Sequence, residues 1–114
     1  MAGLPWVRLD TTTPWNPKIL RLLRMRDGHR AVAVYLLSLA FSGAQGSAGV
    51  LGADSLSFFH ARPGDAARLV EVGLWHEYPD GGWLIHDWDE MQVSQQRSEM
   101  ARKAAEIRWG KGKS

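Results

Sequence analysis

The sequence predicts an α+β domain, and three features of residues 56–88 carry that prediction. A short amphipathic helix is expected from Pro63 to Gly73. Two apolar alternating runs, at 74–78 and 83–88, flank the turn Pro79-Asp80-Gly81-Gly82, and Asp-Gly between such runs is a strong hairpin signal. A short apolar segment, 56–60, precedes the helix and is separated from it by a breaker. Helix, tight turn, helix and hairpin in this order are typical of a winged helix-turn-helix.

The N-terminal part of the chain is expected to hold one strand and two helices. Residues 6–12 alternate apolar and polar side chains and include aromatic and β-branched residues, which predicts a strand. Asn16 suits an N-cap and Pro17 a first helical position, so a helix should run from there to about Met25. The next helix, 30–44, is apolar on nearly every face. We therefore expect it to be the central core helix, buried all round, with Leu37 in the core.

The segment between this helix and the short apolar one is predicted to contain a loop and a small strand. Three glycines and two alanines make residues 43–49 a loop. Val50 and Leu51 fit a third strand of the sheet formed by the hairpin. Asp54 or Ser55 is expected to cap the short helix at 56–60.

The predicted helix 63–73 has a clear division between its two faces. Pro63 suits its first position, and Asp65 in the first turn faces the positive end of the helix dipole. Gly73 can end the helix in a left-handed conformation. The buried stripe is expected to be Ala66, Leu69, Val70 and Gly73. The predicted solvent-facing set is Arg62, Asp65, Arg68 and Glu71.

The formal net charge is only +2, but the basic residues are unevenly distributed. A basic helix is predicted from Ser94 to about Trp109, followed by a flexible end, so the chain divides into a domain at 1–93 and a C-terminal part at 94–114. That part carries six basic and two acidic residues. Such asymmetry indicates a polyanionic partner, although two well-solvated surfaces would explain it equally. The basic residues expected to contact the partner, besides those of helix 63–73, are Lys18, Arg21, Arg24, Arg97, Arg102, Lys103 and Arg108.

Several function classes are not supported by the sequence. It has no cysteine, and no apolar run approaches the length of a membrane helix. The N-terminus lacks the layout of a signal peptide, so a cytoplasmic location in a bacterial cell is expected. The glycine-rich loop 43–49 lacks the Gly-Lys-Ser/Thr ending of a phosphate-binding loop. We therefore expect no enzyme activity and no cofactor.

The histidines are not expected to form a metal site. If the hairpin turn places Tyr78 opposite Trp83, then His76 lies opposite Ile85 and Trp75 lies opposite His86. This register puts His76 and His86 on opposite faces of the sheet, because side chains alternate along a strand. They are therefore interpreted as ordinary surface histidines.

Several motifs resemble a known protein group. They are the Trp-Val-Arg-Leu-Asp-Thr-Thr run before the Asn-Pro-Lys helix, then Leu-Val-Glu-Val-Gly-Leu-Trp, Gly-Gly-Trp-Leu-Ile-His-Asp-Trp and the basic Ala/Arg/Lys-rich helix. Together they resemble the helix-turn-helix proteins of actinobacteria and their phages. The chain is also similar to the N-terminal winged-helix domain of phage replisome-organiser and replication-initiation proteins. The resemblance implies binding to double-stranded DNA, often as a dimer.

Two readings of the function therefore stay open. In the first, the chain binds DNA in phage replication initiation or transcriptional regulation. Arg62 and Arg68 would read guanine edges in the major groove, and Asp80, Gly81 and Gly82 would form the wing. In the second, it is a non-catalytic module that docks on a host protein. The docking surface would be the face of helix 63–73, the acidic corner at 87–90 or the C-terminal helix. A purely structural role in a larger complex is a further alternative. The C-terminal helix is also the predicted dimer contact.

Overall fold

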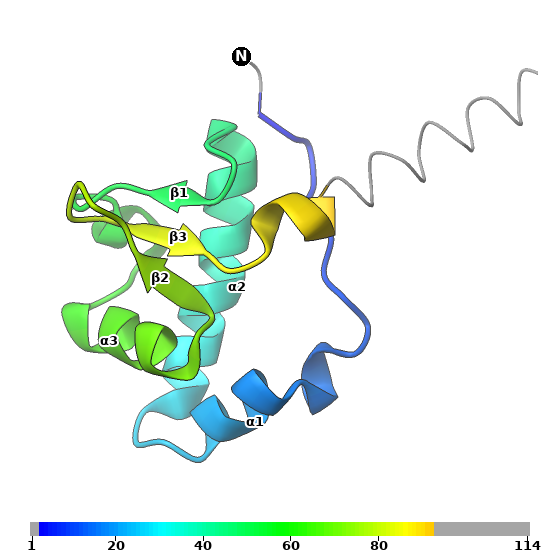
Figure 1. Ribbon diagram of the computed structural model, residues 1–114, viewed down its shortest axis with the longest axis vertical. Coiled ribbons are helices and arrows are strands. Elements are labelled where there is room, and N and C mark those ends of the chain that lie inside the picture. The colour runs from blue at the N-terminus through cyan, green and yellow to red at the C-terminus, as the bar shows by residue number, and fades with distance from the viewer. Residues whose placement is uncertain (1–2, 93–114) are drawn as a thin grey trace, which may run out of the picture.

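The computed structural model describes residues 3–92 and confirms the α+β class (Figure 1). Figure 1 shows the three strands in front of the long helix, with a second helix below the sheet and a third at the bottom. The predicted helix 94–109 and its basic residues lie outside the described part of the chain, so the domain boundary near residue 93 stays a prediction. In chain order, with η for a 3₁₀ helix, the elements are η1 (Thr13–Trp15), α1 (Pro17–Leu23), α2 (Gly28–Gln45), β1 (Val50–Leu51), η2 (Leu56–Phe59), α3 (Pro63–Val72), β2 (Trp75–Glu77) and β3 (Trp83–Ile85).

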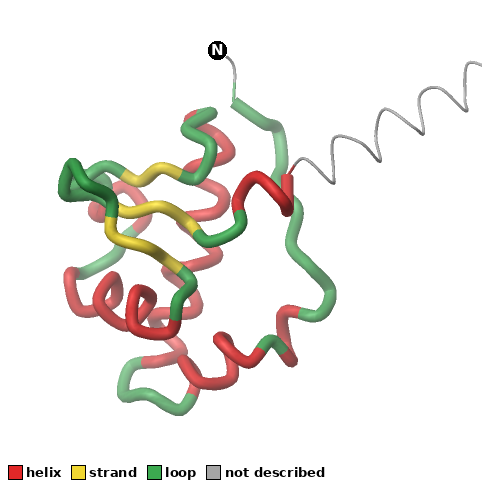
Figure 2. The backbone as a smooth tube through the Cα atoms, in the orientation of Figure 1, coloured by secondary structure: helices red, strands yellow, loops and turns green. Residues whose placement is uncertain are grey.

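The predicted strand at residues 6–12 is wrong. This segment runs as a loop beside the domain (Figure 2). The Asp10 carboxylate accepts a hydrogen bond from the backbone N–H of Thr12 at 3.0 Å, which bends the chain into η1 rather than extending it. The backbone N–H of Arg8 donates to the side-chain oxygen of Gln92 at 3.1 Å, so the segment is held by a side chain and not by a neighbouring strand.

Helix α1 begins where its local chemistry predicts. The Asn16 side-chain oxygen accepts a hydrogen bond from the backbone N–H of Lys18 at 2.8 Å, and Pro17 occupies the first helical position. Ile19 and Leu22 are its buried side chains. The N-cap prediction is therefore confirmed.

Helix α2 is the central core helix, but the prediction that it is buried all round is wrong. Val34 and Leu39 are each 2% exposed, whereas Leu37 is 45% exposed and Leu36 is 38% exposed. Helices α1 and α3, β1 and η2 all pack against α2. Among the residues that the structure describes, these elements leave the face with Leu36 and Leu37 exposed.

The sheet contains three antiparallel strands in the order β1-β3-β2, so Val50 and Leu51 do form the expected third strand. The predicted register of the hairpin is wrong by one residue. Glu77, and not Tyr78, lies opposite Trp83, and His76 lies opposite Leu84. The difference arises in the turn, where the backbone N–H of Tyr78 donates to the carbonyl of Gly82 at 2.9 Å. A shift of one residue moves every side chain of one strand to the other face.

The core lies where the inner face of the sheet meets the three helices. Trp75 is completely buried, and its ring centroid lies 5.6 Å from that of Trp83 and 5.9 Å from that of Phe59. Trp75 and Trp83 thus pack on the inner face, while Tyr78 stays 36% exposed next to the turn. The predicted cross-strand pair of Tyr78 with Trp83 is replaced by this inner aromatic cluster.

The ends of α3 and the short helical segment before it agree with the prediction, whereas the predicted cap of that segment does not. Pro63 begins the helix, and Gly73 ends it with φ of 85°, which glycine adopts without strain. The buried stripe includes Ala66 and Leu69 as expected, with Val72 in place of the half-buried Val70. The preceding η2 is a single 3₁₀ turn without a side-chain cap, because the Ser55 hydroxyl donates to the carbonyl of Gly52 instead.

Within residues 3–92, no helix is both long and apolar enough to cross a membrane.

Candidate functional site

The outward face of α3 is shallow and weakly charged. Gly64, Ala67, Arg68 and Glu71 line a pocket of about 250 Å³ on this face. Arg62 is exposed at the start of the helix. Gly64 and Ala67 have little or no side chain, so a flat or convex partner can approach the helix backbone closely at these positions.

Asp65 does not belong to this face, which corrects its predicted place among the solvent-facing residues. It is only 1% exposed. Its carboxylate accepts a hydrogen bond from the backbone N–H of Arg62 at 2.9 Å and one from Arg30 Nε at 3.1 Å. Asp65 is the third residue of the helix, where a carboxylate can turn back to bind the N-cap N–H. That bond and the guanidinium from α2 draw the side chain inward.

Arg30 extends this contact into a link between three segments. Its Nη2 donates to the backbone carbonyl of His60 at 2.9 Å, so one guanidinium joins α2 to the start of α3 and to the residue after η2. The charge of Asp65 is therefore neutralised inside the protein. The outward face of α3 has one negative charge fewer than the sequence predicts.

Arg68 lies where it was predicted, on the outward side, and it forms one surface ion pair. Its Nη2 lies 3.7 Å from the Asp27 carboxylate, which belongs to the turn between α1 and α2. Asp27 is 60% exposed in its side chain, so the pair contributes little to stability. The contact does place the α1–α2 turn directly beside the α3 face.

The basic residues of α1 and of the turn after it divide into two groups. Lys18 Nζ donates to the carbonyl of Gly73 at 3.2 Å, which is the favourable position for a cation at the end of α3. The predicted contact of Lys18 with a polyanionic partner stays a prediction. Arg21, Arg24 and the neighbouring Arg26 are exposed and form no ion pair with another described residue.

The hairpin turn adds no positive charge to this surface. Asp80 and Gly81 are exposed at its tip. Gly82 is buried, and a Cβ at this position would clash with the backbone carbonyl oxygen of Leu51. Of the three predicted wing residues, two are accessible. The predicted Arg97, Arg102, Lys103 and Arg108 lie outside the residues that the structure describes.

Two histidines that were predicted to lie on opposite faces are in contact. His76 Nε2 and His86 Nδ1 are 2.6 Å apart, and His86 Nε2 lies 3.1 Å from the Asp87 carboxylate. The one-residue difference in register brings them to the same face, and the sequence gives no signal for that difference. Burial lowers the pKa of His86, with a further lowering by the ammonium of Lys18. In residues 3–92, no three His, Asp or Glu side chains form a metal-binding group.

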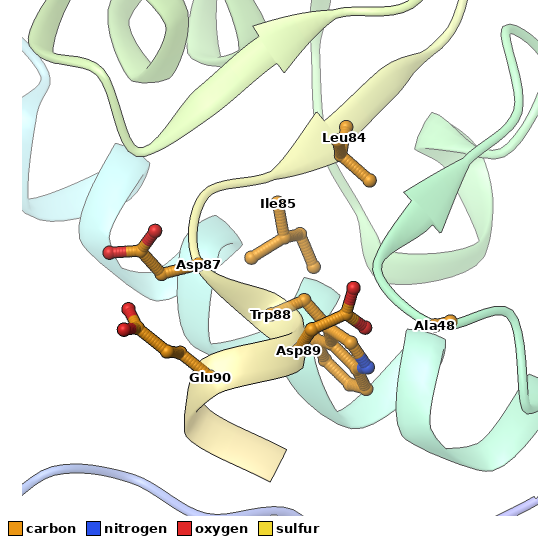
Figure 3. Close-up of a pocket in the computed structure, with 7 residues that line it drawn as sticks. All are labelled: Ala48, Leu84, Ile85, Asp87, Trp88, Asp89 and Glu90. Carbon is orange, nitrogen blue, oxygen red and sulfur yellow. The ribbon is translucent and has the colours of Figure 1, made fainter. Parts of the chain in front are cut away.

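A second pocket lies beyond the end of β3. It has a volume of about 280 Å³, and Figure 3 shows its seven lining residues: Ala48, Leu84, Ile85, Asp87, Trp88, Asp89 and Glu90. In Figure 3 the carboxylates of Asp87 and Glu90 point to one side, and that of Asp89 points toward Ala48. Apolar side chains between carboxylates fit a basic side chain with an aliphatic stem.

No protein-family model matches this chain, and no curated protein or solved structure is significantly similar to it.

Proposed function

We propose that this chain is a winged-helix protein that binds double-stranded DNA through the outward face of α3 and the adjacent arginines of α1 and of the turn that follows it. The order α2, β1, η2, α3, β2, β3, with the strands arranged β1-β3-β2, supports a winged helix in which α3 is the recognition helix. The resemblance to phage initiation and regulatory proteins favours a role in replication initiation or transcriptional regulation.

The position of three exposed arginines beside α3 is the observation that carries this proposal. Arg21, Arg24 and Arg26 are exposed, and their segment packs beside α3 through the contact of Arg68 with Asp27. Arginines that flank a recognition helix would reach the phosphates on either side of a groove. The neutralisation of Asp65 by Arg30 removes a charge that would repel those phosphates.

Reading of the base sequence would depend on few residues. Arg62 and Arg68 are the two basic residues of the α3 face, and arginine is the commonest specific contact to guanine in the major groove. Glu71 on the same face would accept a hydrogen bond from cytosine. The remaining residues of this face, Gly64 and Ala67, have no side-chain hydrogen-bonding group and would contribute only to the fit of the surface.

The salt dependence of binding tests the phosphate contacts. We expect fluorescence anisotropy with a labelled duplex of about 30 base pairs to give log affinity that falls linearly with log salt. Arg21→Ala and Arg24→Ala should each weaken binding to all sequences and reduce the slope by about 1. Arg8→Ala is the matched control, because it removes the same charge from the N-terminal segment, and it should leave the slope unchanged. Equal slopes in all three variants would contradict the proposed surface.

The base preference tests α3. Arg68→Ala should reduce discrimination at one position of a selected site by about 1–3 kcal/mol while non-specific binding persists. Competition between matched and mismatched duplexes measures this difference. If the variant discriminates as well as the wild-type chain, α3 does not read bases.

A second candidate function, docking on a host protein, is favoured by the pocket at Asp87–Glu90. Its carboxylates would meet a lysine or arginine of the partner, whereas they would repel DNA. A pull-down from nuclease-treated host lysate should then lose its captured protein in the Asp89→Asn/Glu90→Gln variant. The same variant should bind DNA as the wild type does if the two surfaces are separate.

A further inference from the structure

The contact between His76 and His86 is built on paired strands. His76 lies in β2 and His86 directly follows β3, and the backbone N–H of His86 donates to the carbonyl of Leu74 at 2.9 Å. The ring centroids are 4.8 Å apart with the rings inclined at 65°. Because the backbone of both residues is held by hydrogen bonds within the sheet, the two rings stay close together in the folded chain.

Asp87 sets the orientation and the tautomer of His86. Its carboxylate lies 3.1 Å from His86 Nε2, and this negative charge favours the tautomer of a neutral His86 ring that carries its proton on Nε2. The lone pair of Nδ1 then points at Nε2 of His76, 2.6 Å away. A carboxylate behind an imidazole in this way is the usual second partner of a metal-binding histidine.

We propose that His76 Nε2 and His86 Nδ1 together bind a divalent ion of the late transition series, such as Zn²⁺, Ni²⁺ or Cu²⁺, with Asp87 as the positioning residue for His86. Imidazole nitrogen is a preferred ligand of these ions, whereas Mg²⁺ and Ca²⁺ require oxygen ligands. The inference is independent of the proposed DNA binding.

The distances fit this assignment after a small side-chain movement. Zinc lies about 2.0–2.1 Å from each nitrogen, so two nitrogens on a tetrahedral ion are separated by about 3.3 Å. The two ring nitrogens would have to move apart by about 0.7 Å, which rotation of these rings allows because His76 is exposed and the His86 side chain is 34% exposed. His76 would move its proton to Nδ1 and offer Nε2 to the ion.

The surroundings make such a site exchangeable rather than permanent. Two protein nitrogens leave the other positions of the ion to water, and structural zinc sites have four protein ligands. The ammonium of Lys18 is close enough to oppose a bound cation, and the carboxylates of Asp87 and Glu90 offset it.

A bound ion would join β2 to the segment after β3 at the open end of the hairpin, opposite the turn. The ion would stabilise the folded chain, because unfolding separates its two ligands. Metal binding should therefore raise the thermal midpoint, and this readout does not depend on DNA binding.

The experiment is a titration of the full, untagged chain with ZnCl₂ and NiCl₂, followed by calorimetry and thermal unfolding. We expect one equivalent to bind and the midpoint to rise, with no effect of MgCl₂. His76→Gln and His86→Gln should each weaken binding by about tenfold or more, and His29→Gln, an exposed histidine of α2, should not. Asp87→Asn should weaken binding by about tenfold while keeping a residue that tolerates the left-handed φ of 56° at this position.

Imidazole ¹⁵N chemical shifts give the assignment without substitutions. Added Zn²⁺ should shift His76 Nε2 and His86 Nδ1 and leave the nitrogens of His29 and His60 unchanged. Undiminished binding in the His76→Gln/His86→Gln double variant, shifts confined to other histidines, or no binding by the wild-type chain would each overturn the proposal.

Discussion

Asp65 is the one carboxylate of the described chain that is almost completely buried, and it organises the start of α3. Its charge is compensated by Arg30 and by the N-cap N–H of Arg62. Removing one partner of a buried ion pair leaves the charge of the other uncompensated. The resulting loss of folding free energy is larger than the net contribution of the intact pair.

We expect Asp65→Ala to lower the free energy of unfolding by about 2 kcal/mol, because it removes the helix cap and leaves Arg30 unpaired. The partial exposure of Arg30 keeps the value below that of a fully buried pair. Urea denaturation measures the change. Glu71→Ala, on the exposed side of the same helix, should stay within about 0.5 kcal/mol of wild type. A similar loss in both variants would contradict this account of Asp65.

Tyr35 gives the protein a pH dependence in the alkaline range. Burial raises the pKa of its phenol above the ordinary value of 10.0, and the nearby Asp87 carboxylate raises it further. The folded chain therefore holds the phenol proton more tightly than the unfolded chain does. Stability from this group is complete below pH 10 and is lost as the pH rises through the folded pKa.

Tyr35→Phe should accordingly flatten the loss of stability above about pH 10, as followed by urea midpoints at increasing pH. Tyr78→Phe is the control, since Tyr78 is exposed next to the hairpin turn. An alkaline limb that is equally steep in both variants and in the wild-type chain would show that the Tyr35 phenol does not cause it.

At the scale of an element, α2 has one buried and one open face, and its leucines should differ sharply. We expect Leu39→Ala to cost about 2–5 kcal/mol, because Leu39 is 2% exposed and its truncation leaves a cavity. Leu37→Ala should cost less than about 1 kcal/mol, because the side chain is 45% exposed. Denaturant midpoints of the two variants test the orientation of the helix, and a larger loss at Leu37 would reverse it.

The elements also show which parts of the fold a sequence can predict. Helix ends depend on local chemistry, so Asn16, Pro63 and Gly73 are in their predicted roles. The exposure of Leu37 depends on how many other elements pack against α2, and the sequence of the helix alone does not determine this number. The contact between His76 and His86 depends on the register of the hairpin, which changes with one residue in the turn. Both the predicted and the observed register bring aromatic side chains of the two strands together, so the aromatic residues do not distinguish them.

For the candidate site, the sequence predicts positions better than it predicts partners. Arg21, Arg24, Arg62 and Arg68 lie on the surface as expected. Lys18 and Asp65 also lie on the expected helices, but each binds a group from a distant segment. Such contacts join residues 35 or 55 positions apart, and helical periodicity alone contains no information about them.

At the scale of the whole molecule, the described residues together form one hydrophobic core. Its buried apolar side chains run from Ile19 to Trp88. We therefore expect the chain without residues 94–114 to unfold at nearly the same urea concentration as the full chain, and to lose DNA affinity with a flatter salt slope. A much lower midpoint would show that the removed part supports the core, and an unchanged slope would place the phosphate contacts on α1 and α3 alone.

Helix α3 is tethered at both ends by cations from other helices, Arg30 at its start and Lys18 at Gly73. A helix fixed in this way is pre-organised, so a ligand that docks on it meets a surface already in its bound shape. Little conformational entropy would be lost on association. Affinity would then depend on Arg30 and Lys18 through the conformation of α3, and loss of either tether would weaken binding of the ligand.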